Sequence, residues 1–358
     1  MSIRKIALLT GGGDCPGLNP AIKSATKKAL LHGIEVLGIR DGWKGIVEGT
    51  QEYLMPLHAD VVRHIDRQGG TILGTSRTNP FKLDKGPEKI LANLKKHQID
   101  ALIAIGGEDT LGVAHKLFSE HKVPVVGIPK TIDRDLGGTD YTLGFESALE
   151  IITDSVDILR STAESHARIF VVEIMGRHAG HLALRGGISA GASITLIPEV
   201  PFDLQKVCDL LAARKARGIR YSIVCVAEGA LPKQGGEILA SGEKDAFGHV
   251  RLGGIAEWLA QEISARTKLE CRSVNLSHLQ RGGKPVAFDR RLGFYLGIAA
   301  VEAVLNKQFG MMASLTNGKI VLKSLSEAVG ALRLVNVKEA YDQVYYQAKR
   351  SILGVQEV

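Results

Sequence analysis

Short apolar runs recur along this chain, and each is followed by a turn or loop and then by a helical pattern. Residues 101–105 precede Gly106-Gly107-Glu108-Asp109-Thr110, and residues 124–128 precede Pro129-Lys130-Thr131-Ile132-Asp133-Arg134-Asp135. Runs of four to eight apolar residues between turn signals are typical of strands buried on both faces. The alternation of such strands with helices predicts an α/β fold with mostly parallel sheets covered by helices.

The alternation extends over most of the chain. The periodicity predicts strands at residues 3–9, 35–39, 101–105, 124–128, 169–174, 193–197 and 222–227. It predicts helices at residues 16–31, 91–97, 110–119, 145–162, 204–215 and 255–264, and a closing helix at residues 335–352. Two long polar loops are expected at residues 76–86 and 235–248.

Size and composition restrict the class of protein. With 358 residues, 45% of them hydrophobic, the chain is long enough for two domains. Its apolar runs are far too short to span a bilayer, and the first residues lack the design of a signal peptide. Four cysteines without a CxxC pair or zinc spacing favour a reducing, cytoplasmic setting.

The net charge of +7 indicates anionic partners or an ordinary basic surface. The densest basic run, residues 214–220, has no interleaved aromatic residues and is typical of a solvated helix end. Nucleic acid and membrane are therefore not expected as partners, whereas phosphorylated substrates would account for part of the basic excess.

Two glycine-rich segments stand where a phosphate can approach the backbone. The segment TGGGDCPG (residues 10–17) follows the first strand, and GGTILGTSR (residues 69–77) ends in Arg77. Neither has GxGxxG spacing, and the chain contains no GxxxxGK[ST] motif. A glycine turn before a helix offers amide donors to phosphate, but the same turn also joins close-packed elements.

Carboxylates follow two strands that are expected to be neighbours. Glu108 and Asp109 come after one strand, and Asp133 and Asp135 after the next. Such carboxylates can hold Mg²⁺ or accept a proton from an attacking hydroxyl, although aspartates in turns also cap backbone amides. Together the two clusters indicate phosphoryl transfer.

A set of residues that suits a sugar phosphate follows the predicted strands of the second half. Its arginines and histidine suit the sugar phosphate, and its carboxylate suits the sugar hydroxyls. The set is Met175, Gly176, Arg177, Glu228, Arg272, His278 and Arg281. His178 and His181 also lie three residues apart, where packing or hydrogen bonding is favoured over metal binding.

Taken in order, these motifs resemble the 6-phosphofructokinase family. The resemblance extends from about Lys5 to Ile298 and rests on GGGDCPGLN, GGTILGTSR, GGEDT, PKTIDRD, SHARIFVVEIMGRHAG, VAEG and SHLQRGG. It implies two similar Rossmann-like three-layer domains with the active site between them. The donor domain would comprise residues 1–144 and about 280–330, and the fructose 6-phosphate domain residues 145–279 and about 331–358.

The resemblance also implies a role for each motif residue. Gly13, Arg77 and Gly107 would hold the donor phosphoryl groups, and Glu108 would lie at the Mg²⁺ position. Asp133 would accept the proton of the sugar 1-hydroxyl, with Asp135 beside it, and Thr131 would contact the reacting end of the sugar phosphate.

The remaining motif residues would bind fructose 6-phosphate: Met175, Gly176, Arg177, Glu228, Arg272, His278 and Arg281. Arg168 would reach that substrate from a neighbouring subunit, which implies a homodimer or homotetramer.

The same resemblance predicts pyrophosphate as the phosphoryl donor. Members that use ATP usually carry glycine at the places of Asp109 and Lys130. A carboxylate at the first place would crowd and repel the α-phosphate of ATP, whereas a lysine pairs with pyrophosphate. Lysine at the second place also occurs in ATP-using members, so Asp109 carries most of this prediction. The expected reaction is reversible and serves glycolysis or gluconeogenesis.

Some positions depart from the family pattern. Arg134 replaces a usual asparagine and is expected to alter the charge near Asp133. In the effector pocket of bacterial ATP-using relatives, Lys23, Lys27 and Gln68 replace arginines, the glutamate position falls near Ala190, and Arg160 is retained. Little control by ADP or phosphoenolpyruvate is therefore expected.

Three other functions compete with this interpretation. An ATP-dependent phosphofructokinase is the nearest, and an NAD kinase shares a GGDGT-like turn but needs no sugar-phosphate set. A non-catalytic sugar-phosphate sensor would have no use for Asp133 and Arg77. The sequence leaves open the choice between dimer and tetramer, and whether sedoheptulose 7-phosphate is also accepted.

Overall fold

The computed structural model describes residues 3–234, 239–244, 250–252 and 254–350. The chain divides into two compact units, Met1–Ala148 with Arg281–Leu332, and Leu149–Gln280 with Arg333–Val358. The sequence-based division had its breaks after residues 144, 279 and 330. The structure has its breaks after residues 148, 280 and 332. The first of these lies inside helix α5 (Phe145–His166), and the second lies inside the 3₁₀ turn η4 (Ser277–Arg281).

The first unit is built on a seven-stranded sheet in the order β13-β12-β5-β4-β1-β2-β3. Its strands are β1 (Lys5–Thr10), β2 (Glu35–Ile39), β3 (Leu54–Pro56), β4 (Ala101–Gly106), β5 (Val125–Pro129), β12 (Met311–Thr316) and β13 (Lys319–Ser324). The five central strands from β12 to β2 run parallel, while β3 and β13 pair antiparallel at the two edges. The three middle strands β1, β4 and β5 are nearly all buried, as their apolar sequences predict.

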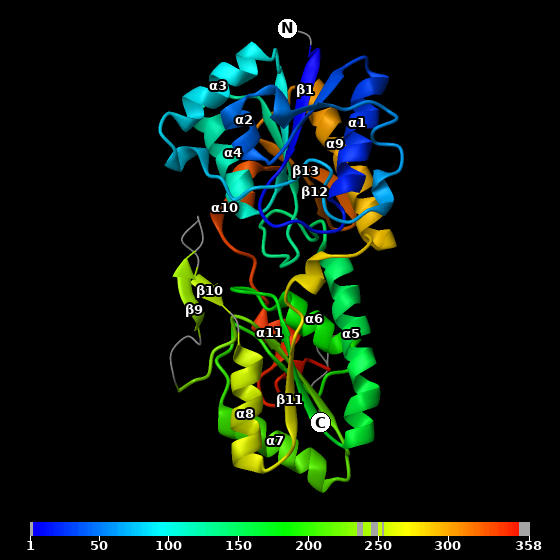
Figure 1. The fold of residues 1–358 in the computed structure, drawn as a ribbon, viewed down its shortest axis with the longest axis vertical. Helices are drawn as coiled ribbons and strands as arrows, with labels where there is room; N and C mark the ends of the chain where they lie inside the picture. Colours follow the sequence, from blue (N-terminus) through cyan, green and yellow to red (C-terminus); the bar gives the residue numbers. More distant parts are fainter. Residues whose placement is uncertain (1–2, 235–238, 245–249, 253, 351–358) are drawn as a thin grey trace. The chain divides into compact units, whose positions relative to one another are not determined.

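Helices cover both faces of this sheet (Figure 1). On one face α1 (Leu18–Leu31) packs against α9 (Ala287–Leu305), and on the other α4 (Glu108–His121) packs against α10 (Leu325–Gly330). The shorter helices α2 (Trp43–Glu48) and α3 (Gly86–Lys96) contact each other, and the turns η1 (Gln51–Tyr53), η2 (Ile65–Arg67) and η3 (Pro80–Lys82) occupy the loops. The sequence patterns predict no element in residues 287–330, where the structure has α9, β12, β13 and α10.

The second unit has a four-stranded parallel sheet in the order β11-β6-β8-β7. Its strands are β6 (Ile169–Ile174), β7 (Ile194–Leu196), β8 (Ser222–Ala227) and β11 (Cys271–Asn275). Helix α6 (His181–Ser189) packs on β7 and β8, whereas α8 (Ile255–Thr267) packs on β6 and β11 and contacts α7 (Leu204–Ala216). The short antiparallel pair β9 (Leu239–Lys244) and β10 (Val250–Leu252) falls where a loop at 235–248 was expected, and the rest of that loop lies outside the described residues.

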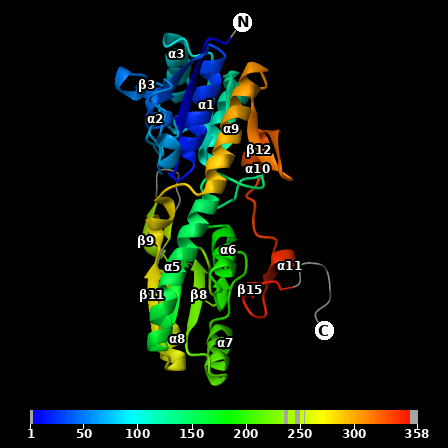
Figure 2. The ribbon, with the colours of Figure 1, turned by 90° about the vertical axis from the view of Figure 1, so that its right-hand side faces the viewer.

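The prediction of a closing helix at residues 335–352 is wrong. That segment contains one helical turn, α11 (Val337–Ala340), and the two short strands β14 (Tyr341–Asp342) and β15 (Gln347–Ala348), and it lies beside α6 (Figure 2). Thr195 N of β7 donates to Tyr346 O at 2.7 Å, and the buried Tyr341 hydroxyl donates to Thr195 O at 2.6 Å. The edge of β7 thus finds partners in this segment, and an edge strand that needs partners outweighs a local helical pattern.

No helix among the described residues has the length and apolar character that crossing a membrane requires.

Asp289 ties three parts of the first unit together. Its fully buried carboxylate accepts hydrogen bonds from Gly144 N at 3.0 Å, Ser147 N at 2.8 Å and Ser147 Oγ at 2.6 Å. Ser147 Oγ in turn accepts from Val286 N at 3.1 Å. Burial raises the pKa of Asp289 to about 6 from 3.8, and these hydrogen bonds oppose that rise. The loop after β5, the start of α5 and the start of α9 therefore share one anchor.

We expect Asp289→Ala to lower the free energy of unfolding by about 2–4 kcal/mol, because it leaves two buried amide groups without an acceptor. Because the pKa of Asp289 is higher in the folded protein than in the unfolded chain, its contribution to stability is largest at a pH below 3.8, the pKa of the unfolded chain. That contribution is lost as the pH rises through about 6, the pKa in the folded protein. Urea titrations should therefore show a larger loss at about pH 5 than at about pH 7. The exposed Asp154→Ala on α5 is the control, and an equal effect of both variants would contradict this role.

Candidate functional site

The carboxyl ends of β1 and β4 form a topological switch point in the first unit. The chain leaves β1 for β2 on one side and later returns to β4 on the other side. Gly11 N, just after β1, donates to Ile105 O of β4 at 3.0 Å. Ligands of open α/β sheets bind outside the carboxyl ends of the strands at such points. The first glycine segment and the GGEDT motif therefore meet at the position where a ligand is expected.

The two glycine segments lie side by side. Gly12 N donates to Ser76 O at 3.2 Å, and Thr75 Oγ1 donates to Gly12 O at 2.5 Å. Gly12 has a φ of +78°, which side chains other than glycine rarely adopt. These contacts place Arg77, the next residue, at the same end of the sheet.

Lys130 joins the loop after β5 to the loop after β1. Its side chain is buried, with 3% exposure, and Nζ donates to Gly13 O at 2.5 Å. Burial lowers the pKa of Lys130 to about 8, and nearby Arg281 lowers it further, while Cys15, Asp14 and Asp133 oppose the shift. A buried amine beside a glycine loop whose backbone a phosphate can approach is a candidate anion-binding group.

Arg281 lies against the same loop. Its Nη1 donates to Asp14 O at 3.2 Å, and a Cβ on Gly13 would lie 2.5 Å from that nitrogen. A side chain at position 13 would therefore have to displace the guanidinium from this position. The predicted role of Arg281 is with the sugar residues of the second half, whereas the structure places it in the first unit beside Gly13.

Glu108 and Asp109 are the first two residues of α4, and Gly107 is its N-cap. Both acidic side chains are exposed, at the helix end that attracts negative charge. The next residue, Thr110, is buried so close to Gly106 and Gly11 that a Cβ at either glycine would collide with it. Because both positions are glycine, the first turn of α4 can pack directly against the loop that follows β1.

The loop that carries Asp133 and Asp135 is closed at its base. Leu143 N donates to Pro129 O at 3.1 Å, and Thr142 Oγ1 donates to Thr131 O at 2.6 Å. Asp133 N donates to Thr131 Oγ1 at 3.1 Å, which orients the start of the loop. Both aspartates are half-buried.

Arg134 has a packing role in that loop. It has a φ of +57°, a region in which asparagine is more common than arginine. Its buried guanidinium donates through Nε to Asp140 O at 2.6 Å and lies 4.3 Å from the ring centre of Tyr141 and 5.4 Å from that of Phe145. The expectation that Arg134 alters the charge near Asp133 stays a prediction.

In the second unit, Met175, Gly176 and Glu228 meet at the carboxyl ends of β6 and β8. Glu228 N donates to Ile174 O at 2.8 Å, and Gly176 N contacts Glu228 Oε1 at 3.5 Å. Met175 N donates to Oε1 of the fully buried Gln280 at 3.1 Å. Gln280 lies two residues after His278, so the structure brings these predicted sugar residues together.

Arg168 and Arg272 lie at the opposite, amino end of the same sheet. Both guanidinium groups contact Glu270, at 2.8 Å from Arg168 Nε and 2.7 Å from Arg272 Nη2. Their position lowers the pKa of Glu270, chiefly through the hydrogen bond from Arg168. The predicted role of Arg272 is with Met175 and His278, whereas in the structure it shares Glu270 with Arg168.

Sequence reasoning missed several residues that organise these sites, among them Gln280, Asp14 and Glu173. Gln280 and Asp14 stand inside the quoted glycine-rich motifs, which was the available signal. Glu173 is an acidic residue inside a buried apolar strand, where a charge requires partners.

The described residues contain no group of three or more His, Cys, Asp or Glu side chains arranged to hold a metal ion. His181 Nε2 instead lies 2.9 Å from Arg333 O. An exposed carboxylate such as Glu108 suits Mg²⁺ that keeps its waters and binds mainly through phosphate oxygens.

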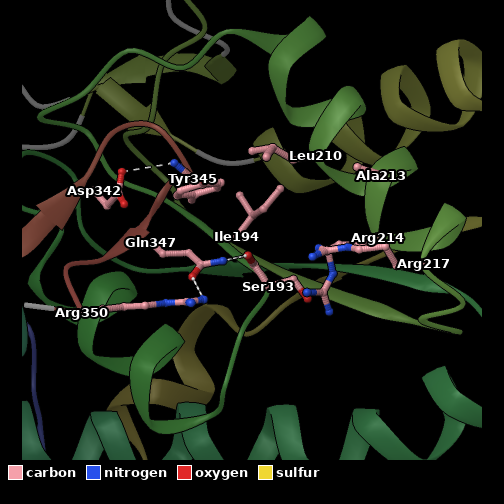
Figure 3. A pocket seen from close by; sticks show the side chains of 10 residues that line it. All are labelled: Ser193, Ile194, Leu210, Ala213, Arg214, Arg217, Asp342, Tyr345, Gln347 and Arg350. Atoms are coloured by element: carbon pink, nitrogen blue, oxygen red, sulfur yellow. Dashed lines mark hydrogen bonds between the residues drawn. The ribbon is translucent and has the colours of Figure 1, made fainter. Parts of the chain in front are cut away.

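A cavity of about 860 Å³ in the second unit is bordered by the C-terminal segment (Figure 3). Arg214, Arg217 and Arg350 line it, and Gln347 Nε2 donates there to Ser193 O at 2.6 Å. None of the predicted site residues lines this cavity, so the strand ends rather than the cavity locate the candidate site.

Comparison with known proteins agrees with these arrangements. Residues 5–304 match the family described as Phosphofructokinase. The pyrophosphate--fructose 6-phosphate 1-phosphotransferase of Amycolatopsis methanolica is 51% identical over 92% of this chain and 96% of its own length. The ATP-dependent 6-phosphofructokinase of Corynebacterium efficiens is 46% identical over 94% of this chain and 96% of its own.

Among solved structures, the fold is similar to that of a pyrophosphate-dependent phosphofructokinase from Nitrosospira multiformis. The TM-score is 0.83 at 21% identity, over 97% of this chain and 89% of the other. The family match over most of the chain and the two-unit α/β fold lead to one conclusion: the chain belongs to the phosphofructokinase family.

Proposed function

We propose that this protein transfers a phosphoryl group reversibly from pyrophosphate to the 1-hydroxyl of fructose 6-phosphate, forming fructose 1,6-bisphosphate and phosphate. The observation that carries the proposal is the buried Lys130 amine on Gly13 O, next to an α4 that begins with Glu108 and Asp109. The relative named pyrophosphate--fructose 6-phosphate 1-phosphotransferase is 51% identical to this chain, against 46% for the ATP-dependent relative reported above, which supports the proposal.

The first unit binds the donor. The amides of Gly13 and Gly107 and the positive end of α4 attract phosphoryl oxygens. Lys130 and Arg77 supply positive charge, and Arg281 adds to it from beside Gly13. Pyrophosphate is small and highly charged, so charge density at this loop matters more than room for a nucleotide.

Asp109 excludes ATP by its position. It occupies the first turn of α4, where the chain of a nucleotide would continue beyond the transferred phosphoryl groups. Its negative charge repels the α-phosphate and its bulk occupies the space that glycine would leave.

Proton transfer is assigned to Asp133, which takes the proton of the attacking hydroxyl while Asp135 stands two residues away. Thr131, whose Oγ1 accepts from Asp133 N, contacts the reacting end of the sugar phosphate and orients the base. Mg²⁺ bound with Glu108 and the donor oxygens would neutralise charge on the transferred group. Arg77 and the loop amides stabilise the remaining charge.

The second unit binds the sugar phosphate through Met175, Gly176, Arg177, Glu228 and His278. Carboxylate and histidine suit sugar hydroxyls, and arginine suits the phosphate. Arg168 and Arg272 share Glu270 at the other end of the sheet, so both are assigned to the substrate of a neighbouring subunit in a homo-oligomer. The setting is cytoplasmic.

The combined change Asp109→Gly with Lys130→Gly tests the donor assignment. We expect kcat/KM for pyrophosphate to fall about 100-fold, since a charge-assisted contact is lost, and some ATP-dependent turnover to appear. Initial rates with magnesium pyrophosphate and magnesium ATP measure both. Glu120→Gly near the other end of α4 is the matched control. Unchanged pyrophosphate rates would mean that these two residues do not select the donor.

The pKa of Lys130 predicts a basic limb in the pH profile. Because the amine loses its proton near pH 8 in the free enzyme, kcat/KM for pyrophosphate should fall about tenfold per pH unit above that point. Lys130→Arg should move the limb upward, since arginine stays charged. The value of kcat/KM for fructose 6-phosphate at saturating pyrophosphate is the control. A level profile from about pH 7 to about pH 9.5 would contradict the role of Lys130.

Two of the side chains at the family's effector positions, Lys23 and Arg160, already have partners. Lys23 Nζ contacts Asp66 at 2.6 Å, and Arg160 donates to Ala190 O and to the Tyr221 hydroxyl, the latter at 3.1 Å. We therefore expect ADP or phosphoenolpyruvate to change the affinity for fructose 6-phosphate by less than about twofold, or about 0.4 kcal/mol. Substrate saturation curves with and without each compound test this, and a several-fold shift would show that an effector site operates.

A further inference from the structure

The turn that follows β11, residues 275–280, carries His278 and is tied to the end of β6 at three points. Asn275 Nδ2 donates to Glu173 Oε1 at 2.8 Å, and Leu276 N donates to Glu173 O at 3.2 Å. Gln280 Oε1 accepts from Met175 N at 3.1 Å. The turn and the Met175 backbone are therefore positioned together.

Glu173 is the most buried charged group of this arrangement, with 3% exposure. Besides Asn275, its carboxylate accepts from Gly254 N at 3.1 Å and Ala256 N at 3.0 Å, at the start of α8. All its partners are donors, and no described cation pairs with it. A buried carboxylate held only by neutral donors costs stability unless each bond is kept, so its geometry is closely defined.

The donors around Glu173 decide how the Asn275 amide is oriented. A carboxylate can only accept, so Nδ2 of Asn275 must face it and Oδ1 must face the other way. Oδ1 accepts from Ser277 N at 2.8 Å. Ser277 has a φ of +41°, a strained conformation for a residue with a side chain, and Ser277 Oγ lies 3.1 Å from His278 Nδ1. The orientation of the Asn275 amide therefore affects the position of the His278 ring through Ser277.

We propose that Glu173 and Asn275 form a positioning pair that sets His278 and Met175 for fructose 6-phosphate. This inference rests on the proposed function, because it assigns the pair to the sugar-phosphate half of that site. Neither residue touches the substrate: the pair acts through Ser277 and Gln280, whose Nε2 donates to Ser277 O at 3.1 Å.

Exchanging the carboxylate and the amide between positions 173 and 275 tests the pair. In Glu173→Gln, the NH₂ group of the new side chain points at Asn275 Nδ2, so two donors face each other. The Asn275 amide then turns over, and Ser277 N loses Oδ1 as its acceptor. In Asn275→Asp, two carboxylates face each other. In the double variant, the glutamine amide at position 173 donates to the aspartate carboxylate at position 275. That carboxylate accepts from Ser277 N, and the glutamine carbonyl oxygen still accepts from Gly254 and Ala256.

We expect each single change to raise KM for fructose 6-phosphate by about tenfold, with KM for pyrophosphate within about twofold, since only the sugar half is disturbed. The double variant should recover KM for fructose 6-phosphate to within about threefold of the wild type. Ser273→Asp adds a carboxylate at an exposed position two residues before Asn275 on the same strand and should leave both KM values unchanged.

Calorimetric binding of fructose 6-phosphate to each variant, without donor, separates two failures. If the wild-type protein does not bind this sugar phosphate, the proposed function is wrong. If it binds and both single variants bind equally well, the positioning pair is wrong. Loss of thermal stability in the singles without a KM change, or failure of the double variant to recover, would also overturn the pair. Should Glu173→Gln fail to fold, the more exposed Asn275→Asp alone decides the KM prediction.

Discussion

The hydrogen bond from Lys130 to the carbonyl of Gly13 joins two loops that are 117 residues apart in the chain. It depends on parallel strands, because only in a parallel sheet do the ends of β1, β4 and β5 meet at one edge. Burying the amine there costs solvation, which appears as a lowered pKa. The same contact keeps a positive charge at the glycine loop, where a phosphoryl donor would bind.

In the described part of the second unit the loops are held together by neutral hydrogen-bond donors around a buried carboxylate, not by a buried cation. Its sheet also brings loops together at the carboxyl edge, where Met175, Glu228 and Gln280 meet. Glu173 lies just before that edge on β6 and ends the hydrogen-bond chain that runs through Asn275. In both units most of the groups assigned to substrate stand on loops, and a buried charged residue, Lys130 or Glu173, defines the loop geometry.

Much of the candidate site could be predicted from the sequence, because strand, glycine loop and helix are local patterns and their order implies a common edge. The strands around residues 101–105, 124–128, 169–174 and 222–227 were predicted correctly for this reason. Which unit a residue joins depends on distant contacts. Arg281 is predicted to bind fructose 6-phosphate through the family resemblance, and its guanidinium lies at the glycine loop of the first unit, because the division between the units falls between Gln280 and Arg281. The predicted C-terminal helix failed because the unpaired edge of β7 recruits that segment.

By itself, the sequence determined the α/β class, the glycine and acidic motifs, and the family to which the chain belongs, because these depend on short patterns and on residue identity. Only the tertiary structure decided which side chains share a partner. Arg272 joins Arg168 on Glu270, Arg134 packs on Tyr141, and Asn275 takes its orientation from Glu173. Such pairings follow from the register of parallel strands and from the need of every buried polar group for a partner, and neither is encoded in local spacing.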